Sequence, residues 1–575
     1  MISGSASATS SAEIPAAASR VGLLRRLPWR WLRRTAQVLF LLLFLWLFRK
    51  TESTGTDTLQ QPANLFFRLD PFAALISVLG SRTLLAVFWP ALLVLMLTIV
   101  LGRFFCGWFC PLGTLLDLVH RVLRPLTRWT HRLSGTRTAA LRPMRYVLLL
   151  LAVGFSVLSL PMAGYLDPFA LLVRGLTFWV DPALTRATDS ALHAVANSPG
   201  PWNTAVQNAA AFVRQHLLGF GDRSHLLGGA ALAMLAAVFV LELVQRRFWC
   251  RYLCPLGAML SVAARWTPLR RVPVKVCPNC PATQSCNDAC RMDAFTTDKA
   301  FKPDDCNLCM DCIADCPDAR TAFRFSRRRT PVPPVDLSRR AALATVAVGL
   351  ATPLVVKAAR IGRPATVDPL LIRPPGAGDE AAFLDRCVRC GLCMKVCPTN
   401  GLQPAALLAG IEGIFSPRLV PRIGYCETNC TLCGQVCPTG AIPKLDVESK
   451  SKVVLGKAVI DQARCLPWAN NEECICCEEH CPVTDKAIGY DEVEAVNGAG
   501  QRVLLKRPFV HWNRCTGCGI CENKCPVDGE SAIQVRRTES VPRGQGRGRG
   551  AGGLRRQARR GSGQRRGARR ELQSE

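Results

Sequence analysis

Cysteine is the residue of this chain whose spacing indicates chemistry. Of the 29 cysteines, 24 fall into six groups of four; three groups read Cys-x2-Cys-x2-Cys-x3-Cys and three are close variants. Four thiolates at this spacing are the ligands of a [4Fe–4S] cluster. Paired zinc sites are the alternative, but structural zinc uses two separated pairs of ligands and not a triplet with a fourth Cys before Pro. The sequence therefore predicts six [4Fe–4S] clusters and one-electron chemistry.

The first two groups lie close together, within residues 266–330. The first group has a stretched spacing and no Pro after its last Cys, whereas the second has the standard spacing. In two-cluster ferredoxins the fourth Cys of each run ligates the other cluster. This exchange predicts two ligand sets, namely Cys277, Cys280 and Cys286 with Cys316, and Cys306, Cys309 and Cys312 with Cys290.

The other four groups occupy residues 364–536, and each ends before a Pro. Cys476 is left over beside Cys477, and we choose Cys477 as the ligand because it gives the Cys-x2-Cys-x3-Cys-Pro spacing of the other groups. The spacing leaves open which groups exchange their fourth Cys. The predicted ligands are Cys387, Cys390, Cys393, Cys397, Cys426, Cys430, Cys433, Cys437, Cys465, Cys474, Cys477, Cys481, Cys515, Cys518, Cys521 and Cys525.

Apolar runs predict the helices that carry these groups. A membrane span needs about 20 mostly apolar residues, and four runs approach that length: Ala36–Phe48, Leu84–Leu101, Tyr146–Met162 and Leu226–Val244. Lys and Arg are concentrated before the first run, between the second and third, and after the fourth. Because cytoplasmic loops carry the excess of Lys and Arg, we expect four spans with the N-terminus inside. The loops 51–82 and 163–225 are then outside. Buried core helices are the alternative.

The predicted membrane domain, residues 36–265, contains an internal duplication. Leu69-Asp-Pro-Phe-Ala returns as Leu166-Asp-Pro-Phe-Ala, and each copy precedes a span that ends in Cys-x3-Cys-Pro-Leu-Gly. Within each motif the two thiols are expected on one helix face. Ligation of a metal or cluster across the pseudo-two-fold axis and simple helix packing are both open for the four thiols, which are Cys106, Cys110, Cys250 and Cys254.

Asp70 and Asp167 belong to the two repeated Leu-Asp-Pro-Phe-Ala segments. An ionisable group close to the membrane favours a functional role. An Asp before a Pro is also the pattern of a helix N-cap with Pro at the first helical position. Both interpretations stay open.

A fifth apolar run, Ala341–Val356, joins the two cysteine arrays. It follows Ser338-Arg-Arg, so residues 336–360 look like a twin-arginine export signal. An ordinary fifth span and a surface helix are the alternatives. In the first two cases the four-group domain lies outside the cytoplasm, and in the last case both arrays stay inside.

The two ends of the chain supply much of its net charge of +30. Residues 1–35 are Ser/Ala-rich and then basic, and residues 537–575 form an Arg/Gly-rich tail without an aromatic side chain. Neither end can bury a core, so we expect disorder. Without aromatics for base stacking, the tail gives no specific reason to expect a nucleic-acid partner. The predicted fold class is an α-helical membrane domain with two α+β ferredoxin-like domains, residues 266–330 and 364–536.

These motifs resemble a known family. Residues 1–320 resemble the NapH-type membrane subunit of periplasmic nitrate reductase systems, related to NosR and CcoG proteins, in the four spans, the two Cys-x3-Cys-Pro-Leu-Gly signatures and the two-cluster domain. Residues 336–536 resemble the NapG-type four-cluster ferredoxin in the order of the motifs and the twin-arginine start. The chain looks like a fusion of the two. The resemblance implies quinol oxidation at the bacterial cytoplasmic membrane.

We therefore predict a multi-pass membrane protein that acts as a quinol dehydrogenase component. Quinol would bind near Asp70 or Asp167, which would accept its protons. The expected partners are the quinol pool, the lipid bilayer, and an extracytoplasmic reductase, such as nitrate reductase, or a small electron carrier. The relatives also suggest two other functions, which are copper reduction or carriage by the Cys-x3-Cys-Pro thiols, and redox regulation or maturation.

Overall fold

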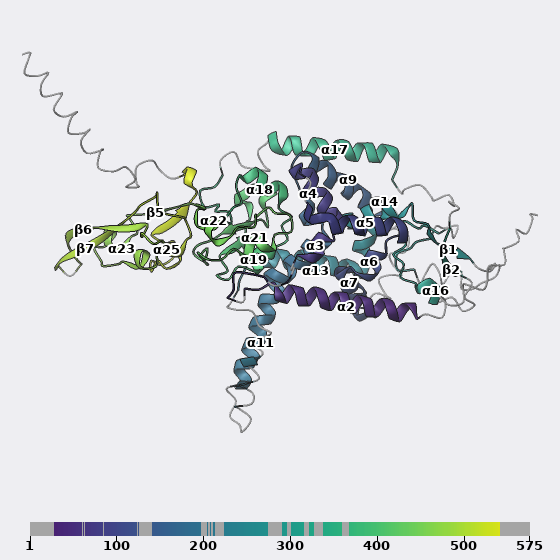
Figure 1. Cartoon of the computed structure of the whole chain (residues 1–575), viewed down its shortest axis with the longest axis horizontal. Coiled ribbons are helices and arrows are strands. Elements are labelled where there is room, and N and C mark those ends of the chain that lie inside the picture. Colours follow the sequence, from purple (N-terminus) through teal and green to yellow (C-terminus); the bar gives the residue numbers. More distant parts are fainter. Residues whose placement is uncertain are drawn as a thin grey trace, which may run out of the picture. The chain divides into compact units, whose positions relative to one another are not determined.

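The computed structural model describes residues 28–53, 55–59, 61, 64–83, 86–123, 125, 141–196, 204, 207–208, 211–212, 223–273, 290–295, 301–314, 321–326, 337–358, 367–498 and 500–540 (Figure 1). The chain divides into two compact units, and each contains one cysteine array. The first unit is Met1–Leu42, Leu95–Val122 and Leu260–Pro334; the second is Leu43–Val94, Leu123–Met259 and Val335–Glu575. Three helices cross these boundaries, namely α2 (Trp29–Lys50), α5 (Trp89–Leu101) and α14 (Pro255–Ala264).

The predicted spans are helices of unequal length. α2 and α17 (Arg339–Ala358) contain the first and fifth apolar runs, and both are long and apolar enough to cross a membrane by length and composition. The other runs form shorter apolar helices of 13, 14 and 17 residues, which are α5, α9 (Met144–Val157) and α13 (Gly228–Val244). A 3-10 turn, η1 (Ala86–Phe88), precedes α5. The four-span topology therefore stays a prediction.

Each Asp-Pro repeat begins a helix. Asp70 is the N-cap of α4 (Pro71–Ser81), and Asp167 is the N-cap of α10 (Pro168–Gly175). Pro suits the first helical position because its missing N–H would have no partner in the first turn. The N-cap interpretation is thus correct for both repeats. Neighbouring elements are α3 (Leu65–Arg68), η3 (Ala163–Tyr165), the π-helical turn η4 (Leu176–Val180) and α11 (Asp181–Ala196).

α17 packs along α9 through two glycines. A Cβ atom on Gly154 would lie 2.9 Å from the backbone carbon of Gly349, so the two helices meet backbone to backbone. Further along α17, Lys357 Nζ donates to the carbonyl of Leu158, which follows the end of α9. The two contacts advance in the same direction along both helices, so α9 and α17 run parallel.

The first unit holds its cysteine loops against α7 (Pro111–Val122). Arg291 Nη1 lies 2.6 Å from Asp117 Oδ2 of α7, and Arg291 Nε donates to Asp311 Oδ2 at 2.9 Å. β1 (Leu269–Pro273) pairs antiparallel with β2 (Thr321–Phe325). α16 (Asp311–Ala314) and α6 (Phe104–Trp108) complete the described elements of this unit.

The ferredoxin part of the second unit has two halves. The N-terminal half, residues 367–445, contains α18 (Glu380–Arg386), α19 (Leu392–Lys395), β3 (Leu402–Pro404), η6 (Leu407–Ala409), α20 (Gly410–Gly413), β4 (Pro417–Leu419) and α21 (Leu432–Val436). β3 and β4 pair antiparallel. α22 (Val447–Ser451) leads into the C-terminal half.

The C-terminal half, residues 457–536, is built on two antiparallel strand pairs. β5 (Lys457–Ile460) pairs with β8 (Ile533–Arg536), and β6 (Ile488–Val496) pairs with β7 (Arg502–Val510). The short helices are α23 (Leu466–Ala469), α24 (Cys476–Glu479) and α25 (Ile520–Asn523), and η7 (Thr538–Ser540) follows.

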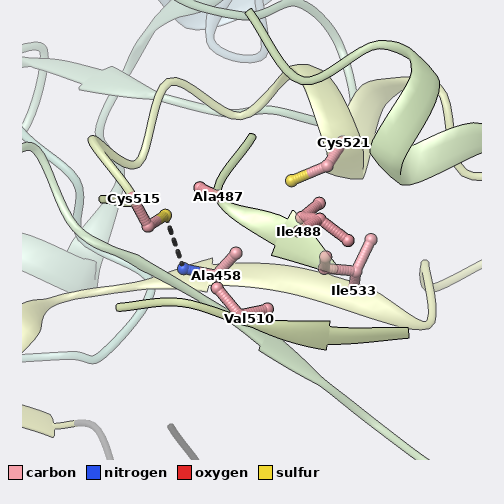
Figure 2. Close-up of a cluster of buried hydrophobic side chains, with 7 residues drawn as sticks. All are labelled: Ala458, Ala487, Ile488, Val510, Cys515, Cys521 and Ile533. Carbon is pink, nitrogen blue, oxygen red and sulfur yellow. Dashed lines mark hydrogen bonds between the residues drawn. The ribbon is translucent and has the colours of Figure 1, made fainter. Parts of the chain in front are cut away.

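Seven buried side chains form the core of the C-terminal half (Figure 2). They come from β5, from β6 and the residue before it, from β7 and β8, and from the Cys515–Cys525 motif: Ala458, Ala487, Ile488, Val510, Cys515, Cys521 and Ile533. Two of the predicted ligand cysteines therefore belong to the apolar core itself, so packing against the strands positions them directly.

Candidate iron–sulfur sites and a buried carboxyl pair

Four cavities in the ferredoxin part are each lined by four cysteines. We name the sets Cys387, Cys426, Cys465 and Cys515 after one member, and their cavities have volumes of about 350, 420, 370 and 340 Å³. The sets are Cys387, Cys390, Cys393 and Cys437; Cys397, Cys426, Cys430 and Cys433; Cys465, Cys474, Cys477 and Cys525; and Cys481, Cys515, Cys518 and Cys521. Four thiols around one cavity are the donor set of a [4Fe–4S] cluster, so these residues fit that group.

Each set takes its fourth thiol from another motif. In the order of the chain, the first and second motifs of this domain exchange Cys397 and Cys437. The third and fourth motifs exchange Cys481 and Cys525. The third Cys of every motif lies on a one-turn helix, α19, α21, α24 or α25, whereas the fourth precedes a Pro. Because Pro cannot continue the turn, it directs the chain and the last thiol away from their own motif. The structure thus gives the pairing that the spacing left open.

Burial is the main cause that raises the pKa of Cys477 and Cys465. The other thiols of the set raise it further, and the pKa of Cys477 rises to about 12 and that of Cys465 to about 11. Like charges this close oppose ionisation, whereas a bound metal centre supplies positive charge and deprotonates its thiol ligands. Backbone N–H groups also point at sulfur, since Ala458 N donates to Cys515 Sγ at 3.4 Å (Figure 2).

Cys476 is not among the residues that line the cavity of the Cys465 set, although it is next in sequence to one that is. The cavity of the Cys465 set is lined by Cys474 and Cys477. Cys476 begins α24 and lies within hydrogen-bonding reach of the Cys474 thiol. The register chosen from the sequence is therefore the one whose thiols line the cavity.

In the first unit, Cys290 lies with three cysteines of the following motif. After burial, the charges of Cys309, Cys312 and Cys290 each raise the pKa of Cys306, which places the four thiols together. This grouping has the exchanged fourth Cys that the spacing predicts. The other predicted set, Cys277, Cys280, Cys286 and Cys316, lies outside the described residues.

The first Cys-x3-Cys-Pro motif contacts the loop that holds this set. α6 carries Cys106 but ends at Trp108, so Cys110 lies beyond the helix and the expected common helix face is absent. A Cβ atom on Gly107 would overlap the backbone of Asn307. Trp108 Nε1 donates to the carbonyl of Leu308 at 3.1 Å. The motif thus packs directly against the Cys306–Cys309 loop.

The second Cys-x3-Cys-Pro motif has a different local fold. Cys250 lies in a π-helical turn, η5 (Trp249–Leu253), and Cys254 follows it before Pro255 starts α14. Gly257 N donates to Cys254 Sγ at 3.3 Å. The Pro starts a new helix at each second thiol, which is why neither pair shares an α-helical face. Convergence of the two motifs on one metal stays a prediction.

Asp70 and Asp167 meet in the interior of the second unit. Asp70 Oδ1 accepts a hydrogen bond from Phe72 N at 2.8 Å, and Asp167 Oδ2 accepts one from Ala170 N at 2.7 Å. The two carboxyl groups also interact with each other. Burial, and then the charge of Asp167, raise the pKa of Asp70 well above its usual range, and burial raises the pKa of Asp167. Two carboxyls this close share a proton more readily than they both ionise.

The N-terminal half of the ferredoxin part packs against the segment that carries Asp167. Gly164 meets the carbonyl of Val388 so closely that a Cβ atom would overlap it. Arg389, in the Cys387–Cys390 loop, is fully buried and donates to the carbonyl of Pro161. Arg174 of α10 lies with its guanidinium 4.4 Å from the Phe415 ring centroid. The Cys387 set therefore lies beside the second Asp-Pro repeat.

A buried ion network fastens the same half to two more segments. Lys395 has no solvent exposure, and its Nζ lies 2.7 Å from both Glu52 Oε1 and Asp181 Oδ2. Arg49 Nη1 contacts the other oxygen of Asp181 at 2.5 Å. Burial alone would raise the pKa of Asp181, but the charges of Lys395 and Arg49 outweigh it and lower the pKa. Sequence reasoning did not identify Arg389 and Lys395 as residues that hold this half in place. The signal that could have identified them is a basic residue between the cysteines of one motif.

Comparison with known proteins gives the class. Two family models match the chain, and both are described as a 4Fe-4S binding domain. One matches residues 82–130 and 227–272, which contain the two Cys-x3-Cys-Pro motifs, and the other matches residues 383–403 and 508–529. With the four-thiol cavities, these matches define an iron–sulfur protein of the ferredoxin type.

Individual relatives give the family. The chain is 37% identical over 182 residues to the methylamine utilization ferredoxin-type protein MauM of Methylorubrum extorquens, which is 31% of this chain and 77% of that protein. It is 37% identical over 166 residues to the ferredoxin-type protein NapG of Escherichia coli, 28% of this chain and 69% of that protein. The chain belongs to this NapG/MauM family of ferredoxin-type proteins. It is also 27% identical over 213 residues to the regulatory protein NosR of Pseudomonas aeruginosa, 36% of this chain and 23% of that protein. No solved structure matches the chain.

Proposed function

We propose that this protein oxidises quinol at a bacterial cytoplasmic membrane and delivers the electrons to an extracytoplasmic acceptor. The observation that carries the proposal is the contact between the Cys387 set and the segment of Asp167. A proton-accepting carboxyl pair and an electron-accepting site are thereby neighbours, as the separation of protons from electrons requires. Bound [4Fe–4S] clusters, six in number on the cysteine count, would take up one electron each.

The proposed topology has support from the contacts of the ferredoxin part. That part packs on residues 52, 164 and 181, which lie in the Arg-poor loops 51–82 and 163–225, and on residue 161 at the adjoining end of the third predicted span. α17 runs parallel to α9, and both helices have arginines at or just before their N-terminal ends. Glycines in contact are typical of helices packed in membranes. Residues 336–360 are therefore proposed to be a fifth span and not a surface helix, with residues 364–536 outside.

The carboxyl pair supplies the proton chemistry of the proposed reaction. Asp70 Oδ2 and Asp167 Oδ1 are buried, and the described residues give them no donor from elsewhere. A pair that shares one proton can take a second from quinol and pass it on, which is the role of a general base. The N-cap bonds hold the other two oxygens in place meanwhile.

Asp70→Asn tests this role. The amide keeps an oxygen for the N-cap bond but cannot accept a proton, so we expect reduction of the iron–sulfur chromophore by a quinol analogue to slow by about 100-fold. The matched control is Asp379→Asn, since Asp379 caps α18 with bonds of 3.0 and 3.2 Å and is far from the pair in sequence. Wild-type reduction rates in Asp70→Asn with full iron loading would refute the role of the pair. Full iron loading without any quinol reduction in the wild-type protein would refute quinol oxidation.

A further inference from the structure

The four cysteine sets have a fixed order along the ferredoxin part. The Cys387 and Cys426 sets share the loop 387–397, because Cys397 belongs to the second set. Cys426 N donates to the carbonyl of Cys518 at 2.9 Å, which joins the Cys426 set to the Cys515 set. Cys518 lies in the loop 515–525, and Cys525 at the end of this loop belongs to the Cys465 set. The order is therefore Cys387, Cys426, Cys515, Cys465. Cys465 is the N-cap of α23, which lies with β6 and β7 at one end of this part (Figure 1).

The two ends of this order differ in their access to solvent. Cys387, Cys390 and Cys393 are buried, and the loops around them contact the segments of Asp167 and Asp181. Cys465 and its partners in the last set are only partly buried. An acceptor in solution can approach the Cys465 set, whereas the Cys387 set is covered by the rest of the unit.

The segment that carries three of the four cysteines of the Cys465 set is acidic, although the whole chain is strongly basic. We call residues 461–496 the terminal face; they contain nine Asp or Glu and two Lys or Arg, for a net charge of −7. Residues 367–445, around the other end, contain six acidic and seven basic residues. The exposed carboxylates of the terminal face include Glu472, Glu473 and Glu479 beside the cysteines and Glu492 and Glu494 on β6.

The terminal face is held as one surface and also offers apolar contact. Asn471 Nδ2 donates to the carbonyl of Val496 at 3.1 Å, and Tyr490 Oη donates to Glu478 Oε2 at 3.2 Å, so β6 is tied to the cysteine segment. Val496 and Leu504 are 54% and 55% exposed on the β6–β7 hairpin. Small apolar patches with a charged rim suit the limited, short-lived interfaces of redox partners.

We propose that the terminal face is the docking surface for the electron acceptor, and that the acceptor is a small redox protein with a basic face. The direction of electron transfer in this inference rests on the proposed function. Each encounter passes one electron from the Cys465 site to the oxidised centre of the acceptor. The quinol oxidised upstream supplies two electrons and releases two protons, so two acceptor molecules are reduced for each quinol.

The test is binding of oxidised cytochrome c, a small haem protein with a lysine-rich face, to the full-length, iron-loaded protein in detergent. The variant Glu472→Lys/Glu473→Lys reverses two charges of the terminal face. The matched control Glu448→Lys/Glu539→Lys makes the same change in net charge at two exposed residues elsewhere, 80% and 82% exposed in their side chains. We expect the dissociation constant at low salt to rise about tenfold in the first variant and less than twofold in the control.

Zero-length coupling of carboxylates to lysines locates the contact independently of affinity. Cross-links from cytochrome c to Glu472, Glu473 or Glu479 support the proposal. Cross-links confined to residues 367–445, or equal weakening by both double variants, would overturn it. Binding to the oxidised protein requires no electron transfer, so it is measured whether or not quinol is oxidised. Quinol-driven reduction without any acceptor tests the proposed function by itself, and the two failures are thus distinguishable.

Discussion

The two halves of the ferredoxin part hold the same kind of site in opposite surroundings. Each half has two cavities lined by four thiols. In every motif the third Cys lies within a one-turn helix and the fourth Cys lines the cavity of the neighbouring motif. The residues between the ligands differ. Two positions after the third Cys, the first motif has Lys395, which is buried between two carboxylates, whereas the third motif has the exposed Glu479. The cysteines therefore define the candidate cofactor site, and the residues between them decide whether the site faces the rest of the unit or solvent.

Removing the buried cation Lys395 should have the largest effect on stability and should affect the N-terminal half more than the C-terminal half. Lys395→Met removes the buried cation shared by Glu52 and Asp181, and breaking a buried ion pair costs about 3–5 kcal/mol of stability. We expect a loss near the lower end of that range, because Asp181 keeps its contact with Arg49. Lys457→Met is the matched change in the other half, where Nζ only donates to the carbonyls of Trp512 and Cys515 and is partly exposed. We expect a loss of about 1 kcal/mol there. Denaturant unfolding of both variants measures the contrast, and equal losses would contradict it.

Adding bulk at the closest backbone contact gives a somewhat smaller effect. Gly164→Val places side-chain atoms against the Val388 carbonyl, and overpacking of this kind costs about 1–3 kcal/mol. Gly498→Val, in the β6–β7 turn, meets nothing within 4 Å and should change stability little. The Gly164 variant should also expose the 387–397 loop to limited proteolysis. Unchanged cleavage would mean that the contact does not hold this half in place.

Acidification should lower the stability of the packing between the N-terminal half and the segment that carries His225. Burial and the charges of Arg223 and Lys395 lower the pKa of His225 to about 4, against the opposing charge of Asp181. His225 stacks on Phe178 with ring centroids 4.9 Å apart. Because the folded pKa is below the unfolded value of 6.5, this contribution is present above pH 6.5 and is lost as pH falls toward 4. At pH 5 the loss is about 2 kcal/mol.

His225→Phe checks that pH dependence. The variant keeps the ring contact with Phe178 but has no group to protonate. Its stability should match the wild type at pH 7.5 and exceed it at pH 5, as measured by thermal unfolding in both buffers. A wild-type protein that loses no more stability than the variant between these values would assign the titration to other groups.

Local sequence was enough to predict the thiol groups and to give the N-cap as one of two interpretations of each Asp-Pro repeat, but it did not predict how the motifs assemble. The Cys-x2-Cys-x3-Cys-Pro spacing selected Cys477 over Cys476, because ligand geometry within one turn is a local property. Cys437 shares a cavity with three cysteines that lie forty to fifty residues earlier in the sequence. This grouping depends on how two motifs pack, which the spacing within one motif does not encode. The lengths of α5 and α9 also differ from the apolar runs, because helix ends depend on caps and tertiary contacts as well as hydrophobicity.

The parallel contact of α17 with α9 has a consequence for how the ferredoxin part meets the helical part of the chain. MauM and NapG are matched over 77% and 69% of their lengths by a third of this chain, so in those proteins the ferredoxin is a small separate chain. Here only residues 359–366 lie between the end of α17 and the described start of the ferredoxin part. A tether this short turns association into an intramolecular step with an effective concentration of about millimolar or more. The helical part of the chain and the ferredoxin part are thereby fixed at one to one, and an interface too weak for two free subunits is sufficient.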